Sequence, residues 1–211
     1  MPGGREFSFQ GITNSASGEI PELVKTIHQQ ILGNFRLCGT MLFKYLGNES
    51  RVTVPDGITA IAEDAFSGKE EMNRIILPDS LEEIGANAFR NCLTLQSAIL
   101  PPSLKKIGAG AFENCVKLIR ISLPDSIKKI ESMTFRHCRQ LKEINFGTSL
   151  SEIGEQAFSG CSALTEISLP ESVAVIGNMA FYRCSKLGSI ELSVNIQHIG
   201  NLAFAQSGIK K

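Results

Sequence analysis

The sequence predicts an α/β repeat solenoid, in which 23-residue coils stack and carry a parallel β-sheet along the stack. Two columns of identical residues and one fact about burial predict it. Because a single coil cannot bury its own apolar side, neighbouring coils must stack and share one core. Both columns keep a step of 23 residues without exception: Phe66, Phe89, Phe112, Phe135, Phe158, Phe181 and Phe204, and Ile61, Ile84, Ile107, Ile130, Ile153, Ile176 and Ile199.

Within each coil the apolar pattern changes its period, which indicates two kinds of local structure. Ala88, Phe89 and Cys92 are spaced like one face of a helical turn. The segment Leu118-x-x-Ile121-x-Leu123 of the next coil alternates like a half-buried strand. A Leu-Pro-Asp-Ser segment then turns the chain, since proline cannot donate to a β-ladder and Asp-Ser favours turns. We therefore expect a helical turn, a strand and a corner in every coil.

A glycine column follows the isoleucine column by one residue. Ala62 and Glu131 replace glycine in two coils. A β-carbon in the left-handed backbone conformation costs roughly 1–2 kcal/mol, so we expect this column to serve close packing at a turn and not positive φ. Its members are Gly85, Gly108, Gly154, Gly177 and Gly200.

The segments before the repeats predict a cap. Residues 1–19 are expected to be flexible, and residues 20–53 to form a capping helix and hairpin. The helix follows from apolar residues at helical spacing between Ile20 and Ile31, with Gly33 as its stop. In the hairpin, residues 41–46 pair with residues 51–54 across a Gly47-Asn48 turn. Residues 54–211 then hold seven copies of the repeat, the last of them incomplete.

Composition excludes several classes of function. The 21 basic and 21 acidic side chains cancel, whereas nucleic-acid binders usually carry a basic surplus, so no nucleic-acid partner is expected. No apolar run approaches the roughly 20 residues of a membrane-spanning helix, and none is predicted. The first residues lack the apolar core of a signal peptide. A cytoplasmic location is expected from the chain as given, and a cell-surface or secreted one if a targeting segment is missing.

Five cysteines also keep the 23-residue step. One hypothesis makes them a metal or redox ladder; the other, which we favour, makes them small apolar groups beside the phenylalanine column. No Cys-x-x-Cys motif and no histidine column accompanies them. His137 adjoins Cys138, but a Cys/His nucleophile would also need an orienting group and a cleft. We expect no catalytic residue, no metal and no cofactor. The column is Cys92, Cys115, Cys138, Cys161 and Cys184.

Charged pairs lie on the back of the coils, at Glu82-Glu83, Lys105-Lys106 and Lys128-Lys129. The stacked lysines suggest an anion site. A solvated face in which the glutamates relieve lysine repulsion explains them more simply, and such surface pairs contribute about 0–1 kcal/mol each.

The recurring run Ile-Gly-x-x-Ala-Phe-x-x-Cys-x-x-Leu-x-x-Ile-x-Leu-Pro-x-Ser-Leu resembles the BspA-like class of leucine-rich repeats over about residues 40–211. The resemblance implies a right-handed leucine-rich-repeat array. Members of this family are largely bacterial surface or secreted proteins, some occur in protists, and they act by binding host or matrix proteins. The resemblance therefore implies an adhesion-like scaffold that binds a protein and has no enzymatic activity, and it supplies no ligand.

The strand register predicts which side chains face a partner, because the residues on either side of an inward isoleucine point out of the sheet. These positions are basic in the first half of the array and acidic in the second, and two isoleucines lie side by side among the basic ones. Clustered exposed apolar residues are typical of interaction sites. The predicted partner-binding residues are Arg51, Arg74, Ile76, Ile99, Ile119, Arg120, Glu143, Asn145, Glu166 and Glu191.

Three other interpretations stay open from the sequence. The exposed sheet is an ordinary solvated surface with an Arg120–Glu143 cross-strand pair, or the array is a structural spacer in a larger bacterial surface protein whose ligand site lies elsewhere. The third, least favoured, is an enzymatic or thiol–metal site on the cysteine column.

Overall fold

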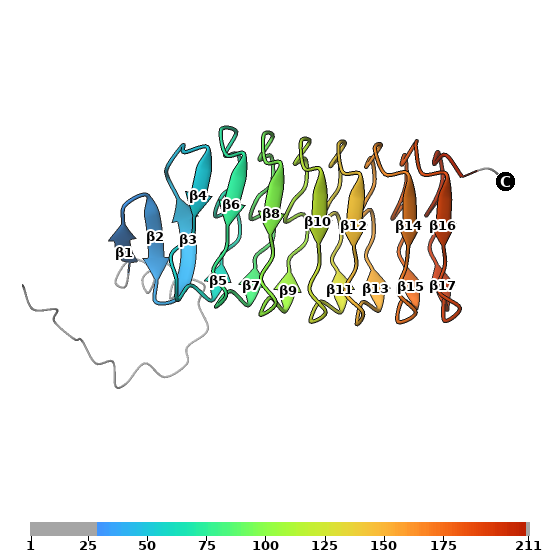
Figure 1. The fold of residues 1–211 in the computed structure, drawn as a ribbon, viewed down its shortest axis with the longest axis horizontal. Coiled ribbons are helices and arrows are strands. Elements are labelled where there is room, and N and C mark those ends of the chain that lie inside the picture. The colour runs from blue at the N-terminus through green and yellow to red at the C-terminus, as the bar shows by residue number, and fades with distance from the viewer. Residues whose placement is uncertain (1–28, 210–211) are drawn as a thin grey trace, which may run out of the picture.

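The structure, a computed structural model, describes residues 29–209. Their coils stack side by side along the long axis of the molecule, and the strands form two rows (Figure 1). The predicted solenoid of 23-residue coils with parallel strands is confirmed. No helix is present among the described residues, so none that could cross a membrane is found there.

The first row of strands carries the alternating segments of the repeat. Its strands pair in parallel in the order β12-β10-β8-β6-β4, followed by a separate pair β14-β16. The row is interrupted between β12 and β14, at the coil where Phe146-Gly147 stands in place of Leu-Pro. Its strands are β4 (Arg51–Thr53), β6 (Arg74–Ile76), β8 (Ser97–Ile99), β10 (Arg120–Ser122), β12 (Glu143–Asn145), β14 (Glu166–Ser168) and β16 (Ser189–Glu191).

The second row consists of two-residue strands that end in the isoleucine column. It divides into β5-β7-β9, which continues from the cap, and β11-β13-β15-β17. Its strands are β5 (Ala60–Ile61), β7 (Glu83–Ile84), β9 (Lys106–Ile107), β11 (Lys129–Ile130), β13 (Glu152–Ile153), β15 (Val175–Ile176) and β17 (His198–Ile199).

The third side of each coil is a ladder of turns. In one coil, Asn87, Phe89 and Asn91 donate their N–H groups to carbonyl groups of the next coil. Three such bonds of 2.7–3.1 Å cross each of the six interfaces between the seven phenylalanine-bearing coils. We call this set of bonds the turn ladder. Among the described residues, it is the one hydrogen-bond system that is present at all six interfaces between these coils.

The predicted helical turn is wrong, because this segment of each coil forms the turn ladder instead. Arg90 and Cys92 donate back three residues within their own coil, while the alternate N–H groups leave the coil. This alternation requires a left-handed backbone at two positions per coil, which no continuous helix permits. The two columns with positive φ are Asp64, Asn87, Gly110, Met133, Gln156, Met179 and Leu202, and Gly68, Asn91, Asn114, His137, Gly160, Arg183 and Gln206.

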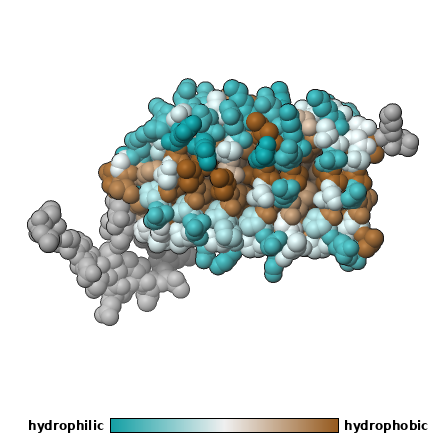
Figure 2. All heavy atoms as spheres, in the orientation of Figure 1, coloured by the Kyte–Doolittle hydropathy of each residue, from teal (hydrophilic) through white to brown (hydrophobic). Residues whose placement is uncertain are grey.

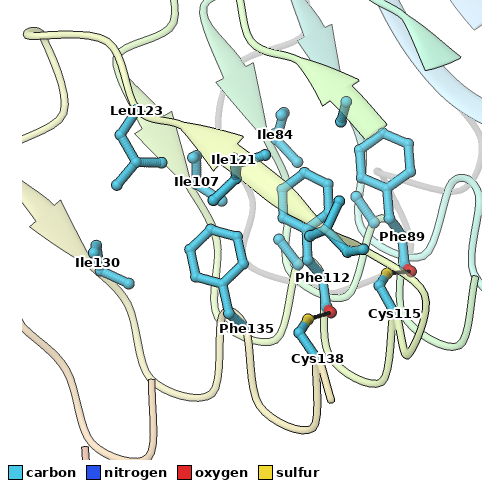
Figure 3. Close-up of a cluster of buried hydrophobic side chains, with 14 of the residues drawn as sticks. Ile84, Phe89, Ile107, Phe112, Cys115, Ile121, Leu123, Ile130, Phe135 and Cys138 are labelled. Carbon is cyan, nitrogen blue, oxygen red and sulfur yellow. Dashed lines mark hydrogen bonds between the residues drawn. The ribbon is translucent and has the colours of Figure 1, made fainter. Parts of the chain in front are cut away.

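The core is a continuous aromatic stack inside the turn ladder. Neighbouring rings of the phenylalanine column lie 5.1–5.6 Å apart, nearly parallel. Figure 3 shows Phe89, Phe112 and Phe135 in this stack, with Cys115 and Cys138 beside their backbones. All rings from Phe66 to Phe181 are fully buried, whereas Phe204 in the last coil is only partly buried.

The glycine column packs against the preceding coil, as predicted. None of its members has positive φ. A β-carbon at Gly108 would lie 2.5 Å from the backbone nitrogen of Ala86, and one at Gly200 would lie 2.4 Å from that of Asn178. Real β-carbons do not approach backbone this closely, so the coils stack at this spacing only because the side chain is absent.

Glu131 stands where the second row divides. It occupies the glycine column, in which the glycines of the neighbouring coils leave no room for a β-carbon against the preceding backbone. The ladder is missing between β9 and β11, and the rings of Phe112 and Phe135 stand 5.6 Å apart, the widest step in the stack. Lys106 and Lys129 also turn away from each other here, toward Glu83 and Glu152 respectively.

The cap differs from its prediction. Residues Gln29–Leu32 form strand β1, so the helix expected to continue to Ile31 does not do so; its earlier part and the flexible segment expected at 1–19 lie outside the described residues. The predicted hairpin is wrong in its pairing. Strand β3 (Met41–Tyr45) pairs antiparallel with β2 (Phe35–Cys38) and parallel with β5, while β4 belongs to the first row.

Tyr45 joins the cap to the repeats. Its ring lies 5.1 Å from both Phe35 and Phe66, so it continues the aromatic stack into the cap. Its N–H donates to the Ala65 carbonyl at 2.9 Å, and its hydroxyl donates to the Glu49 carboxylate. Burial and this contact raise the pKa of Tyr45 to about 12.

The stack predicts unequal costs for removing its rings. Phe135→Ala should lower the free energy of unfolding by roughly 3–5 kcal/mol, as large-to-small core changes do. Phe204→Ala should cost clearly less, because its ring is stacked on one side only. Denaturant unfolding of both variants measures the difference, and equal losses would contradict a core built by stacking.

The glycine column predicts that Glu131→Gly restores the broken ladder. The N–H at position 131 should then donate to the Ile107 carbonyl, as Gly108 donates to Ile84 and Gly154 to Ile130. Hydrogen exchange of this amide should slow. The change in unfolding free energy should be small, since a net gain of about 1 kcal/mol per hydrogen bond is offset by a glycine cost of about 0.5–1 kcal/mol.

Glu131→Ala is the matched control, because it removes the carboxylate and keeps the β-carbon. Its amide at position 131 should exchange as fast as in the unchanged chain. Equal slowing in both variants would show that charge, and not the β-carbon, divides the row.

Candidate functional site

The first row of strands places the predicted residues, with the exception of Ile119, on one exposed face. Parallel pairing aligns Arg51, Arg74, Ser97, Arg120 and Glu143 in one line across five strands. All except the partly buried Ser97 are exposed. In the separate pair, Glu166, Ser189 and Glu191 are exposed as well. The predicted sequence of charges along the face, basic and then acidic, is therefore present in the structure.

Two isoleucines lie side by side two residues further along the same strands. Ile76 pairs in register with Ile99, and their exposed fractions are 44% and 60%. In Figure 2, apolar side chains gather in a band along this side of the molecule, between more hydrophilic regions above and below. Ile119 does not join the pair: it precedes Arg120, is partly buried, and donates its N–H to Gln96 at the other end of β8.

The arginines of the face have no ionic partner among residues 29–209. Arg120 and Glu143 are neighbours in register, yet they form no ion pair in this part of the chain. At the acidic end, the Ser168 hydroxyl donates to Glu191 at 2.8 Å. The arginine charges thus face solvent and are not neutralised by described side chains.

A groove opens between β8 and β10. The register of these two strands contains the single pair Arg120–Ser97, whereas β6 and β8 share three pairs and β10 and β12 share three. The strands separate beyond this pair and leave a groove of about 320 Å³. Its lining is formed by Ser97, Ala98, Ile99, Leu100, Pro102, Arg120, Ser122, Leu123 and Pro124.

Ala98 gives a physical reason for the groove. Every other strand of the first row carries valine or isoleucine at this inward position. The smaller alanine leaves space beneath β8, at the point where its pairing with β10 stops after one pair. The groove was not predicted from the sequence, although alanine in a column of β-branched residues was a visible signal.

The back of the coils is a solvated ion-pair face, as favoured above. Lys105 pairs with Glu82 at 3.0 Å and Lys106 with Glu83 at 2.7 Å. Lys129 contacts both Glu131 and Glu152. All these side chains are more than a third exposed, from 35% for Glu131 to 63% for Lys105. They relieve lysine repulsion, while Lys128 is exposed and forms no ion pair with another described residue.

The cysteine column is buried in the core. Each of its five thiols donates to the phenylalanine carbonyl 26 residues earlier, at 3.1–3.2 Å. Figure 3 shows this contact for Cys115 and Cys138. Burial raises the pKa of Cys92 and Cys184 to about 12, and raises those of Cys115, Cys138 and Cys161 as well. All are free thiols in their neutral form.

The geometry does not assemble a Cys/His site. His137 lies in a left-handed position of the turn ladder, and burial lowers its pKa. The thiol of Cys138 points instead to the Phe112 carbonyl. Within the described part of the chain, no group of three or more His, Cys, Asp or Glu residues is arranged to hold a metal ion.

Comparison with known families identifies the repeat. A family model described as a BspA-type leucine-rich repeat region of 6 copies matches residues 36–128 and 105–211. None of the curated proteins matches the chain.

Solved structures of bacterial leucine-rich repeat proteins share the fold. One from Bacteroides ovatus is 26% identical, with a TM-score of 0.77 over 87% of this chain and 49% of the other. One from Eubacterium ventriosum is 21% identical, with a TM-score of 0.80 over 87% and 51%. The T. pallidum leucine-rich repeat protein is 30% identical, with a TM-score of 0.53 over 77% and 74%. The chain spans about half the length of the first two.

The buried thiols predict a loss of stability in alkali. Their pKa values in the folded chain lie above the value of 9.0 for a free thiol. Above pH 9 the unfolded chain therefore loses protons that the folded chain keeps. The unfolding free energy should fall between about pH 9 and 12, by up to about 1.4 kcal/mol per pH unit for each thiol. Below pH 8 the thiols should give no pH dependence.

Cys138→Ala should reduce this alkaline slope by the share of one thiol in denaturant titrations. At neutral pH, a thiol reagent should label Cys115, Cys138 and Cys161 only after denaturation. Rapid labelling of the whole column in the folded chain would show that these thiols are accessible.

Proposed function

This chain belongs to the BspA-type leucine-rich repeat family, and we propose that it is a non-enzymatic scaffold that presents the exposed face of its first strand row to a protein partner. We call this surface the docking face; it consists of the outward residues of the seven strands of the first row. The single observation that carries the proposal is the exposed Ile76–Ile99 pair flanked by arginines that lack ionic partners among the described residues.

The two kinds of side chain have different roles in this proposal. Ile76 and Ile99 supply apolar area that is removed from water when a partner covers them, and such central anchors dominate binding energy. Arg74 and Arg120 raise the rate of encounter with an acidic surface. The acidic end of the face, with Glu143, Glu166 and Glu191, disfavours a partner placed in the reverse direction.

The rest of the chain supports a binding role over a catalytic one. The five cysteines of the column are neutral and buried, and Lys105, Lys106 and Lys129 on the back of the coils are paired with glutamates. The inward columns and the turn ladder hold neighbouring coils together and repeat the same residue types. Chemical variety is therefore concentrated at the outward positions of the strands.

The spacer interpretation is the second candidate. In the last coil Leu202 is 55% exposed and Phe204 is only partly buried, so this end presents apolar surface on which a further coil can stack. A spacer does not use the docking face to bind a partner. The two proposals therefore predict different effects of a docking-face substitution on the affinity for a partner.

Ile99→Asp should abolish binding of a protein captured with the unchanged chain and leave the fold intact, because the side chain is 60% exposed. Arg74→Glu with Arg120→Glu should slow association and have less effect on dissociation. Surface plasmon resonance of the purified pair measures both rates, and circular dichroism verifies the fold.

Val194→Asp is the matched control, since Val194 is an exposed aliphatic residue, at 89%, outside the strands of the docking face. Its affinity should be unchanged. A captured partner that binds the folded Ile99→Asp variant with unchanged affinity would favour the spacer and contradict the proposal.

A further inference from the structure

The groove between β8 and β10 is the part of the docking face with the most specific shape. Its floor is Ala98, which is 7% exposed, and its walls include Leu123 and two prolines, Pro102 and Pro124. Proline fixes the backbone at both corners, so the walls are rigid before a partner arrives. Its volume of about 320 Å³ is at the low end of pockets that bury small ligands, which are about 300–1,000 Å³.

A groove of about 320 Å³ suits one inserted side chain and not the face of a helix. The lining beyond Ser97 and Ser122 is largely apolar, which selects an aliphatic or aromatic group. Ile99 stands at the rim, 60% exposed. An inserted side chain would cover Ile99, whereas Leu123 in the wall is already buried.

The charges beside the groove are basic on both sides of β8. Arg74 and Arg120 both pair in register with Ser97, one from each neighbouring strand. Neither forms an ion pair with another described residue. A carboxylate above Ser97 would therefore lie between two guanidinium groups.

The distance between the two features gives the spacing of the ligand. Ser97 and Ile99 are two residues apart on one strand, which corresponds to about 6–7 Å. Residues i and i+2 of an extended chain have the same separation and project from the same face. An extended segment with an acidic residue two positions from an apolar one matches both features at once.

We propose that this groove binds an extended segment of a protein partner, inserting one aliphatic or aromatic side chain beside Ile99 at the rim of the groove, while an acidic residue two positions away contacts Arg74 and Arg120 above Ser97. This inference rests on the proposed function and names the chemistry that the docking face recognises. It gives Ala98, a departure from the repeat, the role of opening the site.

Three synthetic peptides titrated into the full 211-residue chain, with amide shifts followed by NMR, test the proposal. The probe is Glu-Ser-Leu-Ser-Glu, which carries acidic residues two positions away on both sides of leucine. Lys-Ser-Leu-Ser-Lys reverses the charge, and Glu-Ser-Ser-Ser-Glu removes the anchor. The probe should shift the amides of Ile99 and Ser122 and bind at least tenfold more tightly than either control peptide.

Ala98→Ile should reduce probe affinity at least tenfold without lowering the thermal unfolding midpoint, because it restores the residue type of the neighbouring strands and fills the floor. Val52→Ile is the matched control: it enlarges the same inward column on β4, away from the groove, and should leave affinity unchanged. Ser122→Trp blocks the groove from the solvent side without touching the core, and should also weaken the probe tenfold.

Equal binding of the lysine peptide, unchanged affinity in the folded Ser122→Trp variant, or no shifts of Ile99 and Ser122 would overturn the inference. The inference would also be overturned if the chain self-associates and Ser122→Trp abolishes that self-association, since the occupant of the groove would then be a second copy of the chain. If these tests fail while Ile99→Asp still abolishes binding of a captured protein, the proposed function stands and only the acidic-segment chemistry is wrong.

Discussion

The turn ladder is the interaction on which the rest of this structure depends. Three backbone hydrogen bonds join every pair of neighbouring phenylalanine-bearing coils, whereas each of the two strand rows is interrupted once. The ladder exists because two residues per coil adopt positive φ, and eleven of those positions are not glycine. Each such residue costs roughly 1–2 kcal/mol, and the bonds of the ladder together with the buried ring between them offset that cost. The aromatic stack and the thiol contacts follow from the spacing that the ladder imposes.

Departures from the repeat act where they change distances between coils. Glu131 adds a β-carbon where neighbouring backbones touch, and the second row divides there. Ala98 removes volume beneath the first row, and β8 loses most of its pairing with β10. Phe146 brings a larger group to the corner position, with its ring 6.0 Å from Phe158, and the first row is interrupted beside it. In all three places the turn ladder is unbroken, so a local defect in a sheet does not divide the rod.

The sequence predicted the coil length, the inward columns, the buried thiols and the outward strand positions, because each depends on a residue type repeated at one spacing. It did not predict the left-handed columns. Asn87, Met133 and Leu202 all have positive φ, but of these residue types only asparagine favours that conformation. The helical turn was predicted wrongly for a related reason. Inward residues such as Ala88, Phe89 and Cys92 have the same spacing in a helix and in the observed turns, and only the destination of the N–H groups separates the two. The cap hairpin was mispaired because β3 and β4 are adjacent in sequence, while the coil geometry assigns them to different rows.

A repeat of this kind separates structural from functional information by position. The interior columns and the turn ladder must keep one geometry in every coil, so they leave no freedom for recognition. Outward strand residues such as Arg74 and Glu166 touch no neighbouring coil's core and vary without cost to the stack. A flat charged sheet, however, offers a partner little shape. Shape arises only where an interior position is altered, and Ala98 is such a position beneath the basic half of the face. The groove therefore combines the two sources of specificity available to a solenoid, free variation of the outward charges and one tolerated defect in the core.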